Sequence, residues 1–168
     1  MTTPPNRTGR CHSQNDAYWA APGRVFRVFQ VRVKVRGYEL DTQGHLNWAE
    51  YLHYAEYTRW EYLAAAGVTQ DALLATGIGP VVLDAHIDFT HELRGGDEVD
   101  VSCVFSWGSR KTFDIVQDFR RADGVLAANL TSTAGFLDLA ERRLITNPAQ
   151  HLRSLATAPD VLGLSADD

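Results

Sequence analysis

The sequence predicts an α+β domain in which an antiparallel sheet of about five strands wraps around one long helix. Three observations favour this fold class. Residues 47–66 carry apolar side chains at helical spacing, the flanking stretches alternate between apolar and polar residues, and short glycine-containing turns join the later strands. Because four strands follow one another without a long helix between them, we expect them to run antiparallel.

The 168 residues divide into three segments. Residues 1–23 are rich in Pro, Asn, Thr and Gly and show no period, so they are predicted to be a disordered leader. Residues 24–147 are predicted to form one domain, which is long enough to bury an ordinary core. Residues 148–168 are rich in Ala and Asp, and we expect them to form a frayed C-terminal tail.

The first strand is predicted around Phe29, and the long helix follows it. Asn47 is a suitable N-cap for this helix, and Gly67 is a suitable residue just beyond its end. One seam of the helix is expected to combine apolar residues with a single cation. Its members are Trp48, Leu52, Ala55, Arg59, Tyr62 and Ala66.

A shorter helical turn is predicted over residues 70–75. The later strands are predicted at 83–89, 99–107, 113–119 and 125–137. In the first of them Leu83 is expected to face the core with Ala85, Ile87 and Phe89. The edge strands of such a sheet are unpaired in a monomer, and apolar edges attract partners, so we expect a dimer.

Composition argues against several classes of function. The net charge of -5 and the absence of a basic run argue against nucleic acid as the main partner. No apolar run reaches the roughly 18 residues needed to span a membrane, and the first residues lack the apolar core of a signal peptide. We therefore expect a cytoplasmic protein that binds neither nucleic acid nor a membrane.

The stretch from Tyr38 to Trp48, YELDTQGHLNW, places acids just before the start of the helix. Asp41 is ionised at neutral pH, and the free N–H groups of a helix start can stabilise an oxyanion on a carbonyl carbon under attack. Alternatively, Asp41 is a turn residue whose carboxylate caps the loop ahead of Gly44. Glu39 is expected to be solvated.

In these features the sequence resembles the hot-dog-fold acyl-CoA thioesterases of the 4-hydroxybenzoyl-CoA thioesterase family. The resemblance covers about residues 26–140. It is carried by Asp41-x-x-Gly44-His45-x-Asn47-x-x-x-Tyr51, Arg59, Leu93-Arg94-x-Gly96-Asp97-Glu98, Ser109-Arg110-Lys111-Thr112-Phe113 and Arg121-Ala122-Asp123-Gly124. It implies hydrolysis of an acyl thioester on coenzyme A or on a carrier protein, which requires neither a cofactor nor a metal.

The resemblance also implies roles at the helix start. Asp41 would act as nucleophile or as general base, and the backbone N–H of Trp48 would hold the thioester oxygen. Gly44 and Tyr51 belong to the same motif and are expected at the substrate. His45 would either orient Asp41 or the attacking water, or bind the loop backbone.

The other candidate substrate-binding residues are Asn47 and three cations. Asn47 either contacts the acyl group or, as we favour, caps the helix. Relatives that act on polyketide chains carry an arginine like Arg59 in the pocket, but we favour an ion pair with Glu56 or with an acid of a partner subunit. Arg110 and Lys111 either meet the phosphates of coenzyme A, often from a neighbouring subunit, or are solvated.

The sequence therefore favours a thioesterase that forms a homodimer and, through a dimer of dimers, a homotetramer, with polyketide biosynthesis as one setting. A non-catalytic acyl-thioester-binding or assembly subunit is the alternative. A dehydratase of the same fold ranks lower, because no Pro-Gly pair follows His45. Asp84, His86 and Asp88 share a strand face, but a flat strand rarely brings metal ligands together, so no metal is expected.

Overall fold

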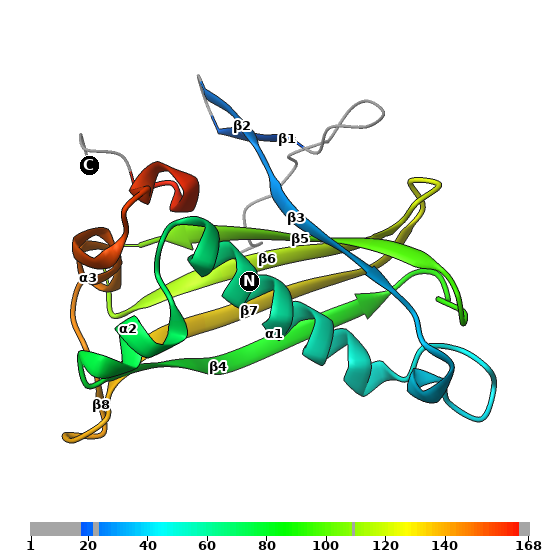
Figure 1. The fold of residues 1–168 in the computed structure, drawn as a ribbon, viewed down its shortest axis with the longest axis horizontal. Coiled ribbons are helices and arrows are strands. Elements are labelled where there is room, and N and C mark those ends of the chain that lie inside the picture. The colour runs from blue at the N-terminus through cyan, green and yellow to red at the C-terminus, as the bar shows by residue number, and fades with distance from the viewer. Residues whose placement is uncertain (1–17, 22–23, 109, 165–168) are drawn as a thin grey trace, which may run out of the picture.

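A long helix, α1 (Trp48–Ala65), crosses the concave face of a curled antiparallel sheet (Figure 1). The computed structural model describes residues 18–21, 24–108 and 110–164. The sheet has six strands in the order β3-β5-β6-β7-β4, with β8 paired to β7. These strands are β3 (Phe29–Lys34), β4 (Ile78–Phe89), β5 (Glu98–Trp107), β6 (Thr112–Arg121), β7 (Leu126–Asp138) and β8 (Arg143–Leu144).

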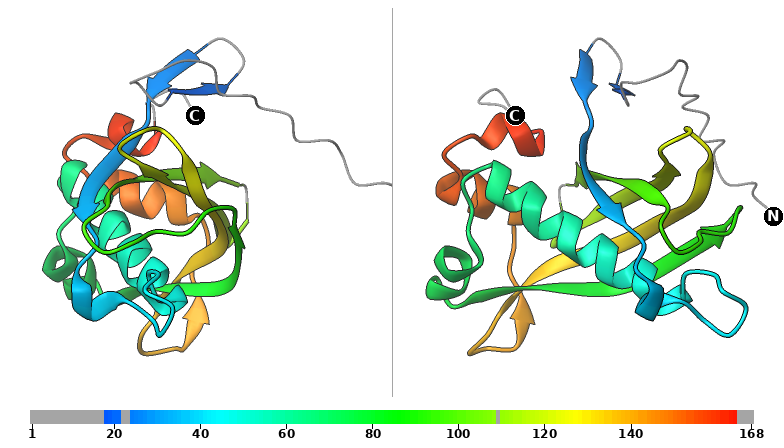
Figure 2. Two further views of the ribbon diagram at one scale, coloured as in Figure 1. Left: turned by 90° about the vertical axis from the view of Figure 1, so that its right-hand side faces the viewer. Right: turned by 45° about the vertical axis from the view of Figure 1, so that its right-hand side comes forward.

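The view along the helix shows the sheet curling around α1 (Figure 2). This confirms the predicted fold class. The sequence also predicts a short extension of the last strand near Leu144, and this region forms the separate short strand β8. A separate two-stranded hairpin, β1 (Tyr18–Ala21) with β2 (Arg24–Arg27), precedes β3. Its first strand falls within the predicted leader, whose other residues, 1–17 and 22–23, lie outside the described part.

Both predicted ends of α1 are confirmed. The side chain of Asn47 accepts a hydrogen bond from the Ala49 N–H at 3.0 Å and so caps the first turn. Gly67 follows the last turn with φ +82°, a left-handed conformation that favours glycine. Thr69 caps the short helix α2 (Gln70–Ala75), which matches the predicted helical turn.

The predicted buried seam of α1 is only partly right. Ala55, Tyr62 and Ala66 are buried, but Trp48 is 66% exposed and Leu52 is also exposed. The core-facing stripe contains instead Tyr51, Tyr54, Ala55, Thr58, Tyr62 and Leu63. Apolar and aromatic residues occur on several faces of this helix, so spacing alone does not select the face that meets the sheet.

The prediction of a frayed tail is wrong for residues 148–164. They form α3 (Pro148–Leu155) and a 3₁₀ turn, η2 (Pro159–Leu162), which pack beside the C-terminal end of α1 (Figure 1). Leu152 and Leu162 are fully buried. The Trp107 indole N–H donates to the Leu162 carbonyl at 2.7 Å. The prediction failed because a few leucines that pack at long range outweigh the polar average composition.

Strand β4 forms one edge of the sheet and differs from its predicted pattern. The register of its pairing with β7 shifts between Val82 and Asp84, which is the signature of a bulge. The prediction that Leu83, Ala85 and Phe89 face the core is wrong in the single chain, since Leu83 is 50% exposed at the bulge and Ala85 and Phe89 are also exposed. No helix in the described ranges is long and apolar enough to cross a membrane.

Candidate active site

The loop between the 3₁₀ turn η1 (Gly37–Glu39) and α1 holds Asp41 in a defined geometry. Its Oδ1 accepts hydrogen bonds from the N–H groups of Gln43, at 2.8 Å, and His45, at 3.1 Å. The Asp41 N–H donates to the His45 carbonyl at 2.8 Å. Gly44 completes the loop with φ +77°, a conformation that L side chains rarely adopt.

These contacts keep the Asp41 carboxylate ionised. The N–H groups of His45 and Gln43 stabilise the charged form and lower the pKa of Asp41 below its ordinary value. Both hydrogen bonds end on Oδ1, so Oδ2 is left for a reactant. Asp41 is therefore a turn residue, as one interpretation held, and its geometry is also compatible with attack on a carbonyl or on water.

The start of α1 offers a backbone donor close to Asp41 in the chain. The cap uses the Ala49 N–H, and the Glu50 N–H donates to the Asn47 carbonyl at 2.9 Å. Among the described residues, no group accepts a hydrogen bond from the Trp48 N–H. A free N–H at a helix N-terminus can stabilise an oxyanion.

Glu39 is buried, contrary to the expectation that it is solvated. Its carboxylate accepts hydrogen bonds from the Tyr54 hydroxyl, the Arg36 guanidinium at 2.9 Å and the Arg36 N–H at 2.7 Å. The Asn47 N–H donates to the Glu39 carbonyl at 2.9 Å. Glu39 thus ties η1 to α1 and positions the loop that carries Asp41.

The two acids therefore have different environments. Burial by itself raises the pKa of Glu39, but the bonds from Tyr54 and Arg36 outweigh it and lower this pKa below the ordinary value. A carboxylate whose pKa is lower in the folded than in the unfolded state stabilises the fold at pH values above its ordinary pKa. This stabilisation is lost as the pH falls through the pKa of the folded state.

We expect the variant Glu39→Gln to be less stable than the wild type at neutral pH, because a neutral amide binds Tyr54 and Arg36 more weakly. The difference should shrink as the pH falls below about 4.3, the ordinary glutamate pKa, because the carboxylate is protonated first in the unfolded chain and, at a lower pH, in the folded wild type. Urea unfolding of both proteins from pH 7 to pH 3 measures this. A gap that is constant with pH would contradict an ionised, stabilising Glu39.

The His45 ring lies beside Glu92. Its Nε2 is 3.4 Å from a Glu92 carboxylate oxygen, and the Arg94 guanidinium also binds this carboxylate. Backbone bridges join the loop of Asp41 to the residues before β5. In one of these contacts the Leu46 N–H donates to the Leu93 carbonyl at 2.7 Å. Sequence reasoning missed Glu92, although it adjoins the Leu93-Arg94-x-Gly96-Asp97-Glu98 motif.

Tyr51 lies in the core beneath the helix start. Its ring contacts those of Phe89 and Phe119, with centroids 5.0 and 5.2 Å away. Burial raises the pKa of Tyr51 to about 12. Within one chain, Tyr51 therefore stabilises the start of α1 by packing in the core.

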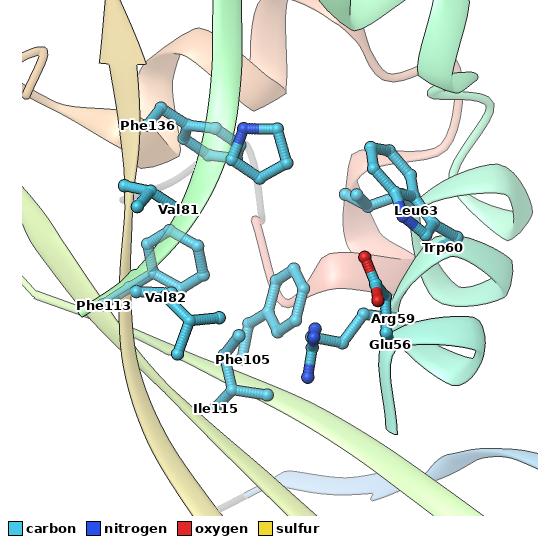
Figure 3. A pocket seen from close by; sticks show the side chains of 12 residues that line it. Glu56, Arg59, Trp60, Leu63, Val81, Val82, Phe105, Phe113, Ile115 and Phe136 are labelled. Carbon is cyan, nitrogen blue, oxygen red and sulfur yellow. The ribbon is translucent and has the colours of Figure 1, made fainter. Parts of the chain in front are cut away.

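A pocket opens between α1 and the sheet, at the half of the helix farther from Asp41 (Figure 3). Glu56 and Arg59 are its charged lining residues. The other lining residues are apolar, namely Trp60, Leu63, Pro80, Val81, Val82, Phe105, Phe113, Ile115, Ala134 and Phe136. The pocket thus combines an aromatic wall with a guanidinium group.

Arg59 does not form an ion pair with Glu56, which is one of the two kinds of partner that we favoured. Its Nη1 donates to Oε1 of Gln117 on β6 at 3.2 Å, and it forms no ion pair with any residue in the described part of the chain. Sequence reasoning missed Gln117 because the two residues are 58 positions apart. A polar residue on the inward face of β6 was the only signal.

The structure does not bring Arg110 and Lys111 to Asp41 within one chain. Both are exposed in the turn between β5 and β6, beyond the paired residues Trp107 and Phe113. The loop of Asp41 contacts residues just before the opposite end of β5. The structure thus brings together Asp41, Gly44, His45, Asn47 and Trp48, and leaves Arg59, Arg110 and Lys111 elsewhere.

A sheet curled around one long helix, with an ionised acid beside the helix start, defines a hot-dog-fold protein with a candidate acyl-thioester site. A family model described as the thioesterase-like superfamily matches residues 35–162. The chain belongs to this superfamily.

Individual relatives agree with this placement. The chain is 34% identical over 77 residues to the chloroplastic acyl-acyl carrier protein thioesterase ATL3 of Arabidopsis thaliana, a match that covers 46% of this chain and 40% of that relative. Among solved structures, the probable thioesterase YbaW of Escherichia coli is 25% identical, with TM-score 0.66, covering 75% of this chain and 94% of its own.

The dynemicin thioesterase, whose structures describe polyene binding, is 26% identical with TM-score 0.65. The match covers 76% of this chain and 94% of that one.

Proposed function

We propose that this protein hydrolyses an acyl thioester, carried by coenzyme A or by a carrier protein, to the free acid and the thiol. The observation that carries the proposal is the pairing of an ionised Asp41, whose Oδ2 is free, with the unpartnered Trp48 N–H at the start of α1. The chemistry needs no cofactor, because a thioester is already activated towards attack.

Asp41 has two routes to the same products. As a general base it takes a proton from water while the water oxygen attacks the thioester carbonyl, and the tetrahedral intermediate then expels the thiolate, which takes up the proton. As a nucleophile it attacks the carbonyl itself, expels the thiolate and leaves a mixed anhydride that water hydrolyses. In both routes the Trp48 N–H stabilises the oxyanion.

Two observations narrow the substrate. The aromatic wall of the pocket suits a flat or conjugated acyl group. The name of the acyl-acyl carrier protein thioesterase supports a carrier-protein-bound chain, and the polyene bound by the dynemicin thioesterase supports a conjugated one, as in the polyketide setting that we propose. Coenzyme A stays in the proposal as the other carrier, although neither Arg110 nor Lys111 reaches the site in one chain.

A release assay tests the proposed activity. Purified protein should liberate free thiol from members of a panel of acyl-CoA and acyl-pantetheine thioesters, followed with a thiol-reactive dye. If the protein binds these thioesters and releases no thiol, the non-catalytic binding module replaces the thioesterase.

We further propose that two chains pair through the β4 edges and that two such dimers associate. Val82, Leu83 and Phe89 expose large apolar side chains along this edge strand, which has no neighbour on its outer side among the described residues. A neighbouring subunit would also be needed to bring Arg110 and Lys111 towards Asp41.

The variant Leu83→Lys is expected to reduce the solution mass to that of a smaller assembly, because it places charge on the paired edge. Sedimentation equilibrium measures this mass, and Leu74→Lys is the matched control, since Leu74 is similarly exposed but lies on α2. An unchanged mass in Leu83→Lys, or an equal loss in both variants, would rule out the β4 interface.

A further inference from the structure

Tyr54, in the second turn of α1, joins the helix to the segment that precedes the Asp41 loop. Its hydroxyl donates a hydrogen bond to a carboxylate oxygen of Glu39, which lies 15 positions earlier in the chain. Both residues are only 5% exposed, so this bond is largely shielded from water. A charge-assisted bond in such a place is stronger than one on the surface.

Arg36 binds the same carboxylate twice. Its backbone N–H donates to Oε2 of Glu39 at 2.7 Å, and its guanidinium donates to Oε1 at 2.9 Å. Together with the Tyr54 hydroxyl, three donors hold this carboxylate. Glu39 is therefore an anchor between two segments and is not placed to act as a second base.

The backbone of Glu39 connects this anchor to both groups of the proposed reaction. Its carbonyl accepts a hydrogen bond from the Asn47 N–H at 2.9 Å. Asn47 directly precedes Trp48, whose N–H is the proposed oxyanion donor, and Asp41 follows Glu39 by two residues. The positions of the acid and of the donor thus both depend on Glu39.

Glu39 holds α1 at two points along its axis. The backbone contact is at Asn47 and the side-chain contact is at Tyr54, seven residues later, which corresponds to a rise of about 10 Å. A helix held at one point can tilt about that point. A second contact about 10 Å away opposes this tilt, and the helix start keeps its orientation towards the loop.

We infer that Tyr54 and Arg36 act as positioning residues of the thioesterase through their bonds to Glu39. These bonds keep the Asp41 carboxylate and the Trp48 N–H at the spacing that attack on a thioester carbonyl requires. The inference rests on the proposed function. A displacement of about 1 Å in such a site can lower the rate by about 100-fold. Loss of a positioning bond should therefore lower kcat more than it weakens substrate binding.

The test compares two variants that each remove one hydroxyl from α1. Tyr54→Phe removes the bond to Glu39, and Tyr62→Phe is the matched control, since Tyr62 is also buried but lies towards the other end of the helix. With an acyl-CoA that the wild type hydrolyses, Tyr54→Phe should lower kcat by about 10- to 100-fold and change KM by less than about threefold. Tyr62→Phe should keep both values near those of the wild type.

A purely structural role of Tyr54 leads to a different result. In that case Tyr54→Phe would lower the unfolding midpoint in urea, and the protein that stays folded would keep the wild-type kcat, which would overturn the inference. Arg36 is tested by rescue. Arg36→Met should lower kcat, and Arg36→Lys, which keeps a cation beside Glu39, should restore most of it. Equal kcat values in the two variants would remove Arg36 from the inference.

The pH profile of kcat is a readout that a loss of stability does not move. Burial raises the pKa of Glu39, and the bonds from Tyr54 and Arg36 lower it. Tyr38 and Glu50 act on these two partners at longer range. Tyr54→Phe should therefore raise the pKa of Glu39, so that kcat begins to fall at a higher pH than in the wild type. An acid limb that stays in place would contradict the inference.

Amide hydrogen exchange separates the inference from the proposed activity. If the wild type releases no thiol from any thioester, the thioesterase fails, and the exchange rates decide whether the anchor holds the site. The N–H groups of Asn47 and His45, which bond to the anchor and to the loop carboxylate, should exchange faster in Tyr54→Phe than in Tyr62→Phe. Equal rates in the two variants would overturn the inference.

Discussion

Replacing Asp41 with asparagine is expected to lower kcat/KM for thioester hydrolysis by at least about 100-fold. The asparagine side-chain oxygen can still accept the N–H groups of Gln43 and His45, so the loop should keep its conformation. What the variant lacks is the negative charge, and with it both the basicity and the nucleophilicity that the two routes require. Asp41→Asn therefore separates the chemistry of this residue from its role in the turn.

Asp97→Asn is the matched control for this experiment. Asp97 also sits in a turn and accepts a backbone hydrogen bond, from the Arg94 N–H at 2.8 Å, but it has no place in the proposed reaction. Its variant should keep the wild-type rate and a similar unfolding midpoint. Full activity in Asp41→Asn, or an equal loss in both variants, would remove Asp41 from the mechanism.

The environment of Asp41 also determines the acid side of the pH profile. Only the ionised carboxylate is competent in either route, and its pKa is lowered by the N–H groups of His45 and Gln43. Activity should therefore hold as the pH falls to about 3.9, the ordinary aspartate pKa, and decline only below it in protein that stays folded.

Single turnover in ¹⁸O-water distinguishes the two routes of Asp41, because label in Asp41 would identify the nucleophilic route.

The parts of the fold that the sequence predicted are those determined by local chemistry. The alternation in β3 and the caps at Asn47 and Gly67 involve residues at most a few positions apart. The loop of Asp41 belongs to the same class, since its hydrogen bonds span two to four residues. The geometry of a motif with such short-range contacts can be predicted from the spacing of its residues in the sequence.

The features that sequence reasoning missed depend on contacts between distant segments. Glu39 is buried because Tyr54, 15 residues later, supplies a hydroxyl, and Arg59 faces Gln117 across 58 residues. The exposure of Leu83 follows from a register shift against β7 that no local pattern announces. In each case the partner, and not the residue itself, decides the environment.

The C-terminal segment provides the most direct test of this kind of long-range packing. Leu152→Ala is expected to lower the free energy of unfolding by about 2–5 kcal/mol, because it removes a fully buried side chain and leaves a cavity. Leu155 lies on the same helix but is only partly buried, so Leu155→Ala should cost less. Urea unfolding of the two variants and the wild type measures the difference.

A frayed tail and a packed helix lead to opposite results in this comparison. If residues 148–164 were frayed, Leu152 would be as exposed in the folded state as in the unfolded state, and neither variant would change the stability. If these residues pack as α3 and η2, Leu152→Ala should lower the free energy of unfolding, and the cavity that it leaves should also disturb the packing of the pocket. Phe136 links the two, since it lines the pocket and its ring lies 6.3 Å from that of His151 on α3. Leu152→Ala is therefore expected to disturb the pocket while leaving the Asp41 loop, at the other end of α1, in place.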